Sequence, residues 1–454
     1  MAGGLGLDIL RQNIASGASH DSGERFNAPK CDPDTRLAII DMIMDWVNDS
    51  EQSSSMLWLR GSAGVGKSSL TQTIAQHCTK IGCLAGSFFF CRTAHERSDG
   101  RLLISTLSYQ LTSTFPASRS IIKKTVNLDP QVLQLSLESQ MQKLFIEPIN
   151  RVARSLIRRY ITHYTHSHPR LVVIDGLDEC SDPAVQCEIL RVLGITLQSL
   201  RFPFRFLIAS RPEVHIIRTL NEMKAISLKK IDLSEHGLQT DSDIRTFLIK
   251  RFSQIKETHP LQPYLPLAWP SDEKVDELVR RSSRQFIYAS VAMRYISCPK
   301  NRPIERLDII LGLSPRPAKD IPFAQLDELY THILSSIDNI NIVLKILGIL
   351  IIPRTKKFHV SKYSTPKMLE TLLDLQPGDV ELYLNDLQSV VTIESPHKPI
   401  IILHASFSDF LIDPSRTGPR FYVNIGASHA TLAGEFMKAV SRKPSKSYCL
   451  PLWS

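Results

Sequence analysis

The sequence lacks the features of disulfide-rich, membrane-spanning and repetitive proteins. Its eight cysteines in 454 residues form no CxxC pair and no regular framework, which argues against a secreted disulfide scaffold. The longest uncharged apolar run near the C-terminal half, residues 346–352, is far shorter than the roughly 18 residues that span a bilayer. The start has no basic segment before a long apolar stretch, and no internal repeat is visible. We therefore expect a soluble protein of the cytoplasm with no membrane span.

Signals for a metal centre or a nucleic-acid interface are also weak. His163, His166 and His168 stand close together, but no cysteine or carboxylate joins them at ligand spacing, so a polar stretch ahead of a strand explains them better. The net charge of +9 is small and scattered. The nearest thing to a basic patch fits a solvated helix face: Arg151, Arg154, Arg158 and Arg159. No basic stretch is interleaved with aromatic residues, so we expect no nucleic-acid partner.

Length and composition instead indicate a globular protein of two or three domains, with 43% hydrophobic and 22% charged residues. In the first 235 residues, short apolar runs alternate with segments of helical periodicity. This pattern predicts an α/β domain with a mostly parallel sheet and right-handed crossovers. The expected strands are Met56–Arg60, residues 84–91, residues 171–175, Phe204–Ser210 and, more weakly, residues 225–228.

After about residue 236 the pattern becomes helical. The expected helices cover residues 243–252, residues 272–281, Phe286–Ile296, residues 326–337 and residues 342–350. Strand signals return only at residues 390–393 and 400–403, which predict a small hairpin or wing. Proline-rich joints at residues 258–270 and 313–322 are the expected linkers.

The clearest motif is GSAGVGKS, which follows a predicted strand and precedes a predicted helix. It fits the pattern G-x-x-x-x-G-K-[ST] of a phosphate-binding loop, in which backbone N–H groups and a helix N-terminus surround phosphate oxygens. Lys67 would reach the β and γ phosphates and Ser68 would bind Mg²⁺; the alternative is an ordinary glycine-rich turn. The residues expected to bind the nucleotide are Gly61, Ser62, Ala63, Gly64, Val65, Gly66, Lys67, Ser68 and Ser69.

Carboxylates follow the predicted strand at residues 171–175 in LVVIDGLDEC. Asp175 lies at the end of the strand, where it is expected to hold the Mg²⁺ water shell. Either Asp178 or Glu179 could orient the attacking water, and the alternative is that both are helix N-terminal charges. The strand Phe204–Ser210 ends before Arg211, which would then lie at the same sheet edge and could read the γ phosphate or form a salt bridge. No [NT]KxD guanine motif is present, so adenine is the expected base.

Four segments together resemble one family: GSAGVGKSSL, LVVIDGLDEC, FLIASRPE and HASFSDFLID at residues 404–413. The flank ASGASHDSGERFNAPKCDPDTR is of the same style. Over residues 15–430 the chain resembles a NACHT-type P-loop NTPase of the STAND class, the signal-transduction ATPases with numerous domains. The form is that of basidiomycete fungi and is similar to nephrocystin-type NACHT segments.

The resemblance implies a sheet ordered 5-1-4-3-2, followed by a helical domain and a winged-helix domain. It implies that Arg211 senses the γ phosphate and that His404 contacts the β phosphate of ADP; alone, His404 would read as a core histidine. The family usually carries a glycine pair where this chain has Ser283 and Arg284, so nucleotide affinity could differ. The expected domains are residues 1–30 (N-terminal flank), 31–235 (nucleotide-binding), 236–315 (helical), 316–425 (winged helix) and 426–454 (tail).

The resemblance also implies a function. We expect an ATP- and ADP-binding signalling switch with Mg²⁺, in which nucleotide state and slow ATP hydrolysis control self-assembly, in the setting of fungal innate immunity or non-self recognition. With no effector region ahead and no repeat array behind, the chain is expected to be a bare switch core. The alternative is a scaffold for protein partners that holds nucleotide without hydrolysing it.

Overall fold

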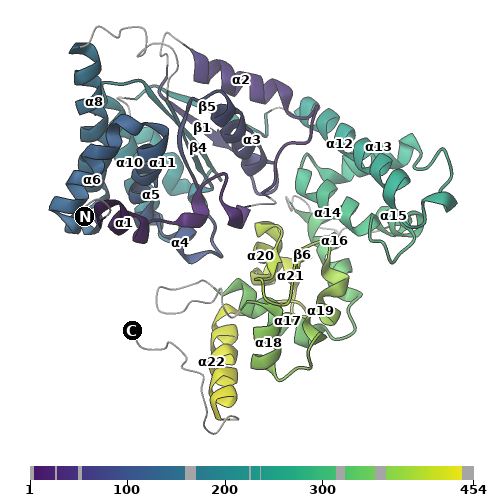
Figure 1. Cartoon of the computed structure of the whole chain (residues 1–454). Helices are drawn as coiled ribbons and strands as arrows, with labels where there is room; N and C mark the ends of the chain where they lie inside the picture. The colour runs from purple at the N-terminus through teal and green to yellow at the C-terminus, as the bar shows by residue number, and fades with distance from the viewer. Residues whose placement is uncertain are drawn as a thin grey trace. The chain divides into compact units, whose positions relative to one another are not determined.

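The computed structural model describes residues 5–25, 28–49, 54–158, 170–223, 226–235, 237–312, 323–352 and 364–441. The chain divides into two compact units, residues 1–247 and residues 248–454 (Figure 1). The three clustered histidines and the proline-rich joint at 313–322 lie outside the described residues.

The first unit is built on a five-stranded sheet in which every pair of neighbouring strands is parallel. The order across the sheet is β2-β3-β4-β1-β5. A strand order has no direction, so the same sheet counted from β5 reads 5-1-4-3-2. The strands are β1 (Met56–Arg60), β2 (Leu84–Phe89), β3 (Arg170–Asp175), β4 (Phe204–Ser210) and β5 (Leu228–Asp232).

Helices cover both faces of this sheet, as Figure 1 shows. The helices of this unit are α1 (Leu5–Gln12), α2 (Leu37–Asn48), α3 (Lys67–Lys80), α4 (His95–Ser98), α5 (Leu103–Thr114), α6 (Arg119–Leu128), α7 (Leu137–Met141), α8 (Glu147–Arg158), α10 (Pro183–Ser199) and α11 (Val214–Glu222). Helix α12 (Gly237–Thr258) begins in this unit and ends in the next.

The two faces of the sheet bury alternate residues of each strand, as strand geometry requires. On β1, Met56 and Trp58 join the larger core, which contains residues of α1, α5, α6, α7 and α10. Leu57 and Leu59 join the smaller core on the other face, with α2 and α3. Because both faces are buried, the strands are continuous apolar runs, which is why the sequence predicts them well.

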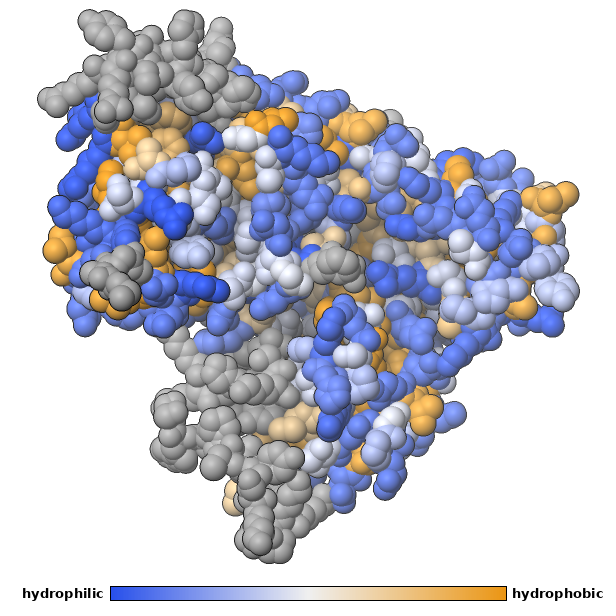
Figure 2. All heavy atoms as spheres, in the orientation of Figure 1, coloured by the Kyte–Doolittle hydropathy of each residue, from blue (hydrophilic) through white to orange (hydrophobic). Residues whose placement is uncertain are grey.

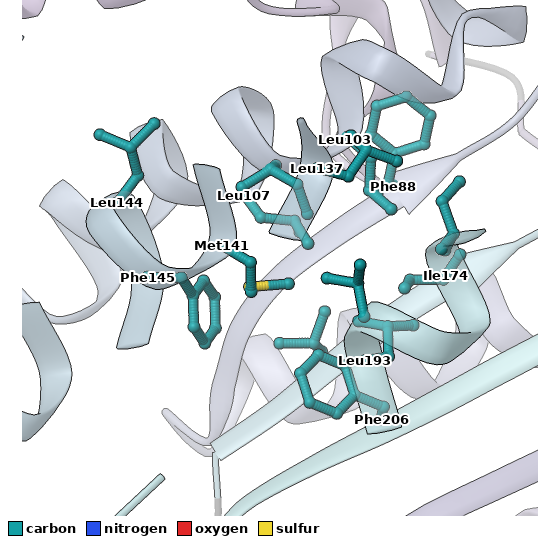
Figure 3. Close-up of a cluster of buried hydrophobic side chains, with 14 of the residues drawn as sticks. Phe88, Leu103, Leu107, Leu137, Met141, Leu144, Phe145, Ile174, Leu193 and Phe206 are labelled. Carbon is teal, nitrogen blue, oxygen red and sulfur yellow. The ribbon is translucent and has the colours of Figure 1, made fainter. Parts of the chain in front are cut away.

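The larger core is dominated by aromatic and branched side chains that fill the space between sheet and helices (Figure 3). Phe145 of the helical stretch before α8 packs edge-on against Phe204, with ring centroids 5.3 Å apart. Residues of the N-terminal flank, Leu10, Ala15 and Ala18, are fully buried in the same core. The described part of the flank is therefore an integral part of the first unit.

The second unit is mainly helical. Beyond α12 its helices are α13 (Asp272–Ser282), α14 (Phe286–Ile296), α15 (Pro303–Gly312), α16 (Ala324–Ser335), α17 (Ile340–Ile351), α18 (Pro366–Leu373), α19 (Asp379–Leu384), α20 (Ala405–Ile412), α21 (Pro414–Thr417) and α22 (Ile425–Ser441). The buried Tyr330 of α16 packs against Phe407 and Phe410 of α20, with centroids 4.9 and 5.4 Å apart.

The expected hairpin is present as two short antiparallel strands, β6 (Val391–Thr392) and β7 (Ile401–Ile402). The prediction for the fifth strand of the first unit is wrong in position, because residues 225–228 overlap β5 only at Leu228. β5 lies at the edge of the sheet, and of its residues only Ile231 is buried. An edge strand with Lys229 and Lys230 has no continuous apolar run, so its sequence signal is weak.

The surface on the face drawn in Figure 2 is mostly hydrophilic, with hydrophobic residues in small separate patches. Large exposed apolar side chains such as Leu128, Val214 and Leu267 belong to different elements. Among the described residues, no helix combines the length and the apolar content needed to cross a membrane.

Candidate functional site

The carboxyl ends of β1, β3 and β4 meet at one edge of the sheet. Asp175, the last residue of β3, pairs in register with Ala209 of β4, and Ala209 pairs with Leu59 of β1. The glycine loop (residues 61–66), Asp175 and Arg211 therefore leave the sheet at the same edge, as expected from parallel strands. In open α/β sheets this edge is where ligands bind.

The glycine loop joins β1 directly to α3. Gly64 and Gly66 have φ values of 78° and 98°, which favour glycine, and a Cβ at Gly61 would lie 2.9 Å from Val65 Cγ2. The buried Arg36 stabilises the loop with a hydrogen bond, which its Nη2 donates to the Val65 carbonyl oxygen at 2.9 Å. Residues with a Cβ in place of Gly61, Gly64 or Gly66 would therefore destabilise this conformation of the loop.

Lys67, the first residue of α3, folds back over the loop. Its Nζ donates to the carbonyl oxygens of Gly61 and Ser62, each at 2.8 Å. Burial lowers the pKa of Lys67, and the nearby Arg211 adds to this effect while Asp178 opposes it. A desolvated ammonium group beside a turn of backbone amides is a strong attractor for an anion.

Asp175 is buried and lies against the start of α3. Its Oδ1 accepts a hydrogen bond from the Thr71 hydroxyl at 2.8 Å. Burial raises the pKa of Asp175, and hydrogen bonding with Ser68 and Thr71 lowers it in part. Of the two residues predicted to hold Mg²⁺, Asp175 is therefore bonded to the first turns of α3, the helix that carries Ser68.

Asp178 and Arg211 form an ion pair. The Arg211 Nε lies 3.1 Å from Asp178 Oδ2, and the Arg211 backbone N–H donates to Oδ1 at 2.9 Å. Asp178 is brought there by a turn (Leu177–Glu179) that begins at Gly176, where φ is 68°. The salt bridge that the sequence left as an alternative for Arg211 is thus present. Together with the backbone hydrogen bond, it engages both carboxylate oxygens of Asp178.

Glu179 has a different hydrogen-bond partner from Asp178. The half-buried carboxylate accepts one hydrogen bond at Oε2, from the Arg92 backbone N–H at 3.1 Å. Burial, together with the Asp178 charge, raises the pKa of Glu179 to about 7. A carboxyl group that titrates near neutral pH is suited to accepting a proton, so Glu179 fits the role of general base better than Asp178.

The structure adds a residue that sequence reasoning missed. Arg25, in the N-terminal flank, lies with its guanidinium 3.9 Å from the centre of the Phe89 ring at the end of β2. Burial, with the nearby Arg97 charge, lowers the pKa of Arg25 to about 10, while Asp175 and Glu179 are attractive neighbours. No motif marks this position, because Arg25 reaches the site only through the fold of the flank.

His404 belongs to the second unit, between β7 and α20. Its Nε2 is buried and has no hydrogen-bond partner among the described residues. Burial and the Arg294 charge lower the pKa of His404 to about 3, so the ring is neutral. In the same unit, Ser283 and Arg284 have φ values of 45° and 64°, the glycine-like conformation, although neither is glycine.

The first unit is thus an α/β domain with a glycine loop, a lysine and a group of carboxylates at the carboxyl edge of a parallel sheet. Residues 40–211 match the family model described as nephrocystin 3, N-terminal, so this segment is nephrocystin-like. The match covers less than half of the chain. It includes the glycine loop, Asp175 and Arg211 but neither Arg25 nor His404.

No curated protein matches the chain. No NACHT or P-loop NTPase family model was detected on it, so the NACHT resemblance stays a prediction. The assignment of a winged helix stays a prediction too.

Proposed function

We propose that the chain is an ATP- and ADP-binding signalling switch of the NACHT type. The observation that carries the proposal is the buried Asp175 at the end of β3, which is hydrogen-bonded to Thr71 of α3. The first residue of the same helix, Lys67, donates to the carbonyl oxygens of Gly61 and Ser62. In a Mg²⁺–nucleotide site, an ammonium group binds the phosphates, and a hydroxyl and a carboxylate hold the Mg²⁺.

Each group fits one part of such a ligand. The backbone amides of residues 61–69 and the Lys67 ammonium would hold the phosphates. Ser68 and Asp175 would hold Mg²⁺, whose charge would in turn offset the cost of burying Asp175. Adenine is the proposed base, because the sequence lacks a guanine motif.

Slow ATP hydrolysis is part of the proposal. Glu179 would accept the proton of the attacking water, because its carboxyl group titrates near neutral pH and its Oε1 accepts no hydrogen bond from the described residues. Asp178 would instead position Arg211. Slow turnover suits a switch, whose nucleotide state must outlast a signal.

The switch would work through competition for Arg211. With ADP, Arg211 would keep its ion pair with Asp178, and the neutral His404 would contribute its buried Nε2 to the closed state. With ATP, Arg211 would exchange Asp178 for the third phosphate. A ligand shifts such an equilibrium only by its differential affinity for the two states, which this exchange would supply.

Thermal unfolding of the purified chain with Mg²⁺ and ADP or ATP tests the binding site. Each nucleotide should raise the unfolding temperature of the wild-type chain, because a ligand that binds only the folded state stabilises it. Lys67→Ala should remove this rise. Lys80→Ala, the same change on the exposed end of α3, should keep it. An equal rise in both variants would refute the assignment.

The second candidate is a scaffold that holds nucleotide without turning it over. The observation in its favour is that Asp178 and Glu179 both already accept N–H donors. Single-turnover phosphate release separates the two functions. A switch that hydrolyses ATP should lose release in Glu179→Gln, whereas the wild-type scaffold should release none.

Self-association is the proposed output, in a cytoplasmic setting. Replacing His404 by Leu should increase the fraction of oligomer in light scattering while ATP binding persists. A variant that stays monomeric and retains ADP would contradict the role proposed for His404.

A further inference from the structure

The N-terminal flank is held against the sheet edge by His20. Its backbone N–H donates to the Ser87 hydroxyl at 3.0 Å, and its Nε2 lies 2.9 Å from the Thr79 hydroxyl. Thr79 is on α3 and Ser87 is on β2, so His20 ties the flank to two elements of the first unit. The side chain is 8% exposed, which makes it a fixed anchor.

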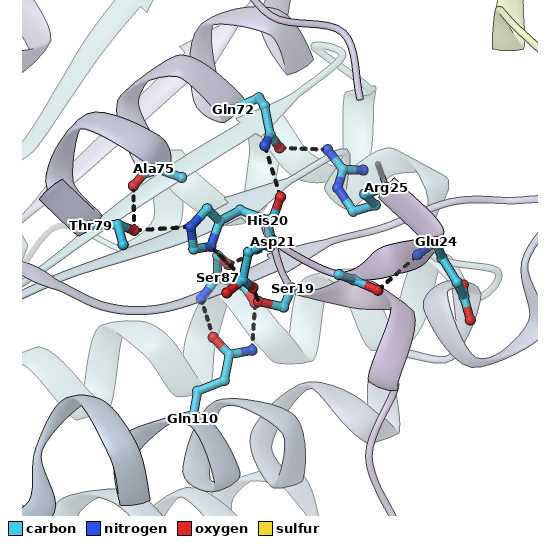
Figure 4. Close-up of polar contacts among 11 residues, drawn as sticks. Ser19, His20, Asp21, Glu24, Arg25, Gln72, Ala75, Thr79, Ser87 and Gln110 are labelled. Atoms are coloured by element: carbon cyan, nitrogen blue, oxygen red, sulfur yellow. Dashed lines mark hydrogen bonds and ion pairs between the residues drawn. The ribbon is translucent and has the colours of Figure 1, made fainter. Parts of the chain in front are cut away.

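Gln72 connects this anchor to Arg25 (Figure 4). Its Nε2 donates to the His20 carbonyl at 2.8 Å, and its Oε1 accepts from Arg25 Nη2 at 2.8 Å. Gln72 is buried and lies on α3, the helix that begins with Lys67. The position of Arg25 is therefore set by the same helix that carries Lys67 and Ser68.

Arg25 stands at the site's edge of the sheet. The Phe89 ring beneath its guanidinium belongs to β2, and Phe89 pairs in register with Asp175 of β3. The glycine loop follows β1, which lies on the other side of β3 in the strand order. A phosphate chain that starts at the loop and passes Asp175 would end on the side where Arg25 lies.

The guanidinium has spare hydrogen-bonding capacity. Its Nε is buried and has no hydrogen-bond partner within the described part of the chain. Asp175 and Glu179 attract the charge and Arg97 repels it, yet Arg25 forms no ion pair within 4.0 Å with any described carboxylate. A buried N–H without a partner is costly, and a phosphate oxygen would supply the missing acceptor.

We propose that Arg25 is a phosphate ligand of this site and that it makes the site prefer a nucleoside triphosphate to a diphosphate. The proposal rests on the nucleotide site proposed above. It assigns to the flank a direct part in binding: Arg25 would read the last phosphate from the β2 side, opposite Arg211, which follows β4.

Calorimetric titration of Arg25→Gln tests this assignment, with Mg²⁺ and either a non-hydrolysable ATP analogue or ADP. The preference for the triphosphate should fall about tenfold, the effect of losing one charge-assisted hydrogen bond. Arg11→Gln removes the same charge from an exposed position of α1 and should leave the preference unchanged. An Arg25→Gln protein that is folded and keeps the wild-type preference would overturn the proposal.

Amide exchange of the wild-type chain gives a test that needs no variant. The segment around residues 19–25 should exchange more slowly with the triphosphate analogue than with ADP, because only the triphosphate would engage Arg25. Equal protection by both ligands would overturn the proposal. If the wild-type chain binds neither nucleotide, the proposed function itself fails; binding of both with an unchanged preference in Arg25→Gln removes only the role of Arg25.

Discussion

Charged side chains are arranged differently in the two units, as a cluster in the first and as a closed ion pair in the second. At the sheet edge of the first unit, three cations and three carboxylates gather within one small region: Arg25, Lys67, Arg211, Asp175, Asp178 and Glu179. In the second unit, Asp327 of α16 and Arg416 of α21 form a closed pair, with Arg416 Nη2 and Nε at 2.6 and 3.1 Å from the two carboxylate oxygens.

The two groups of charged side chains differ in how completely their hydrogen-bonding groups are paired. The Asp327–Arg416 pair satisfies both partners, and Arg416 also stacks near Phe323, 4.8 Å from the ring centre. At the sheet edge, by contrast, the Arg25 Nε has no acceptor among the described residues, and within that part of the chain Lys67 donates to backbone carbonyls alone. Buried groups that the fold leaves incompletely paired are candidates for ligand binding, whereas paired ones hold helices together.

The closed pair should be the most sensitive to substitution. Asp327→Asn leaves the half-buried Arg416 without its counter-charge and should lower the free energy of unfolding by about 3 kcal/mol. The exposed Lys274–Asp308 pair is a control within the same unit, so Asp308→Asn should cost less than about 1 kcal/mol. Urea denaturation measures both. Equal, small losses would mean that the buried pair is not structural.

Thr71 offers a smaller and pH-dependent test at the sheet edge. Thr71→Val keeps the shape but removes a donor to the buried Asp175, and should cost about 2 kcal/mol. The loss should be greater at high pH, where Asp175 must be ionised, than at low pH. Thr112→Val, whose hydroxyl donates only to the Tyr109 carbonyl, should show no such dependence in urea denaturation. A pH-independent loss at Thr71 would contradict the account of Asp175.

Glu179 should make the ligand-free protein less stable as pH rises. Its pKa rises from the ordinary value of 4.5 to about 7 in the folded state. The resulting stabilisation is complete below pH 4.5 and is lost as pH rises through 7. Between about pH 5 and 8 the wild-type chain should lose about 2.5 kcal/mol more than Glu179→Gln, measured by denaturation. Parallel pH profiles would place the Glu179 pKa near its ordinary value.

The smallest expected effect is a gain in the second unit. Ser283 follows α13 with φ of 45°, a conformation that favours glycine. Ser283→Gly should therefore raise the free energy of unfolding by about 0.5–1 kcal/mol. Ser297, which follows α14 with φ of −78°, is the matched control, and Ser297→Gly should be destabilising in the same thermal unfolding assay. A loss at both positions would contradict the strain assigned to Ser283.

Much of the sheet could be predicted because β1, β3 and β4 are buried on both faces and read as continuous apolar runs. β5 could not, since Lys229 and Lys230 interrupt its apolar run. The helical prediction for Phe286–Ile296 coincides with α14, whose buried face gives a clear period. Nothing in local periodicity, however, indicated that the flank packs into the core of the first unit.

The same division holds for the site. The placement of Lys67, Ser68 and Asp175 at one sheet edge was predictable, because each belongs to a local motif whose geometry follows from strand, loop and helix. The choice between Asp178 and Glu179 was not, because it depends on a contact with Arg211, 33 residues away. Arg25 depends on a still longer connection, through Gln72 on α3, which no sequence spacing encodes.

Calorimetric titration of the wild-type chain and Asp175→Asn with ATP, with and without Mg²⁺, tests most directly whether the glycine loop and Asp175 form one nucleotide site. We predict one nucleotide bound per wild-type chain, more tightly with Mg²⁺, and little effect of Mg²⁺ in Asp175→Asn. Absence of binding by the wild-type chain, or a full Mg²⁺ effect in the variant, would contradict it.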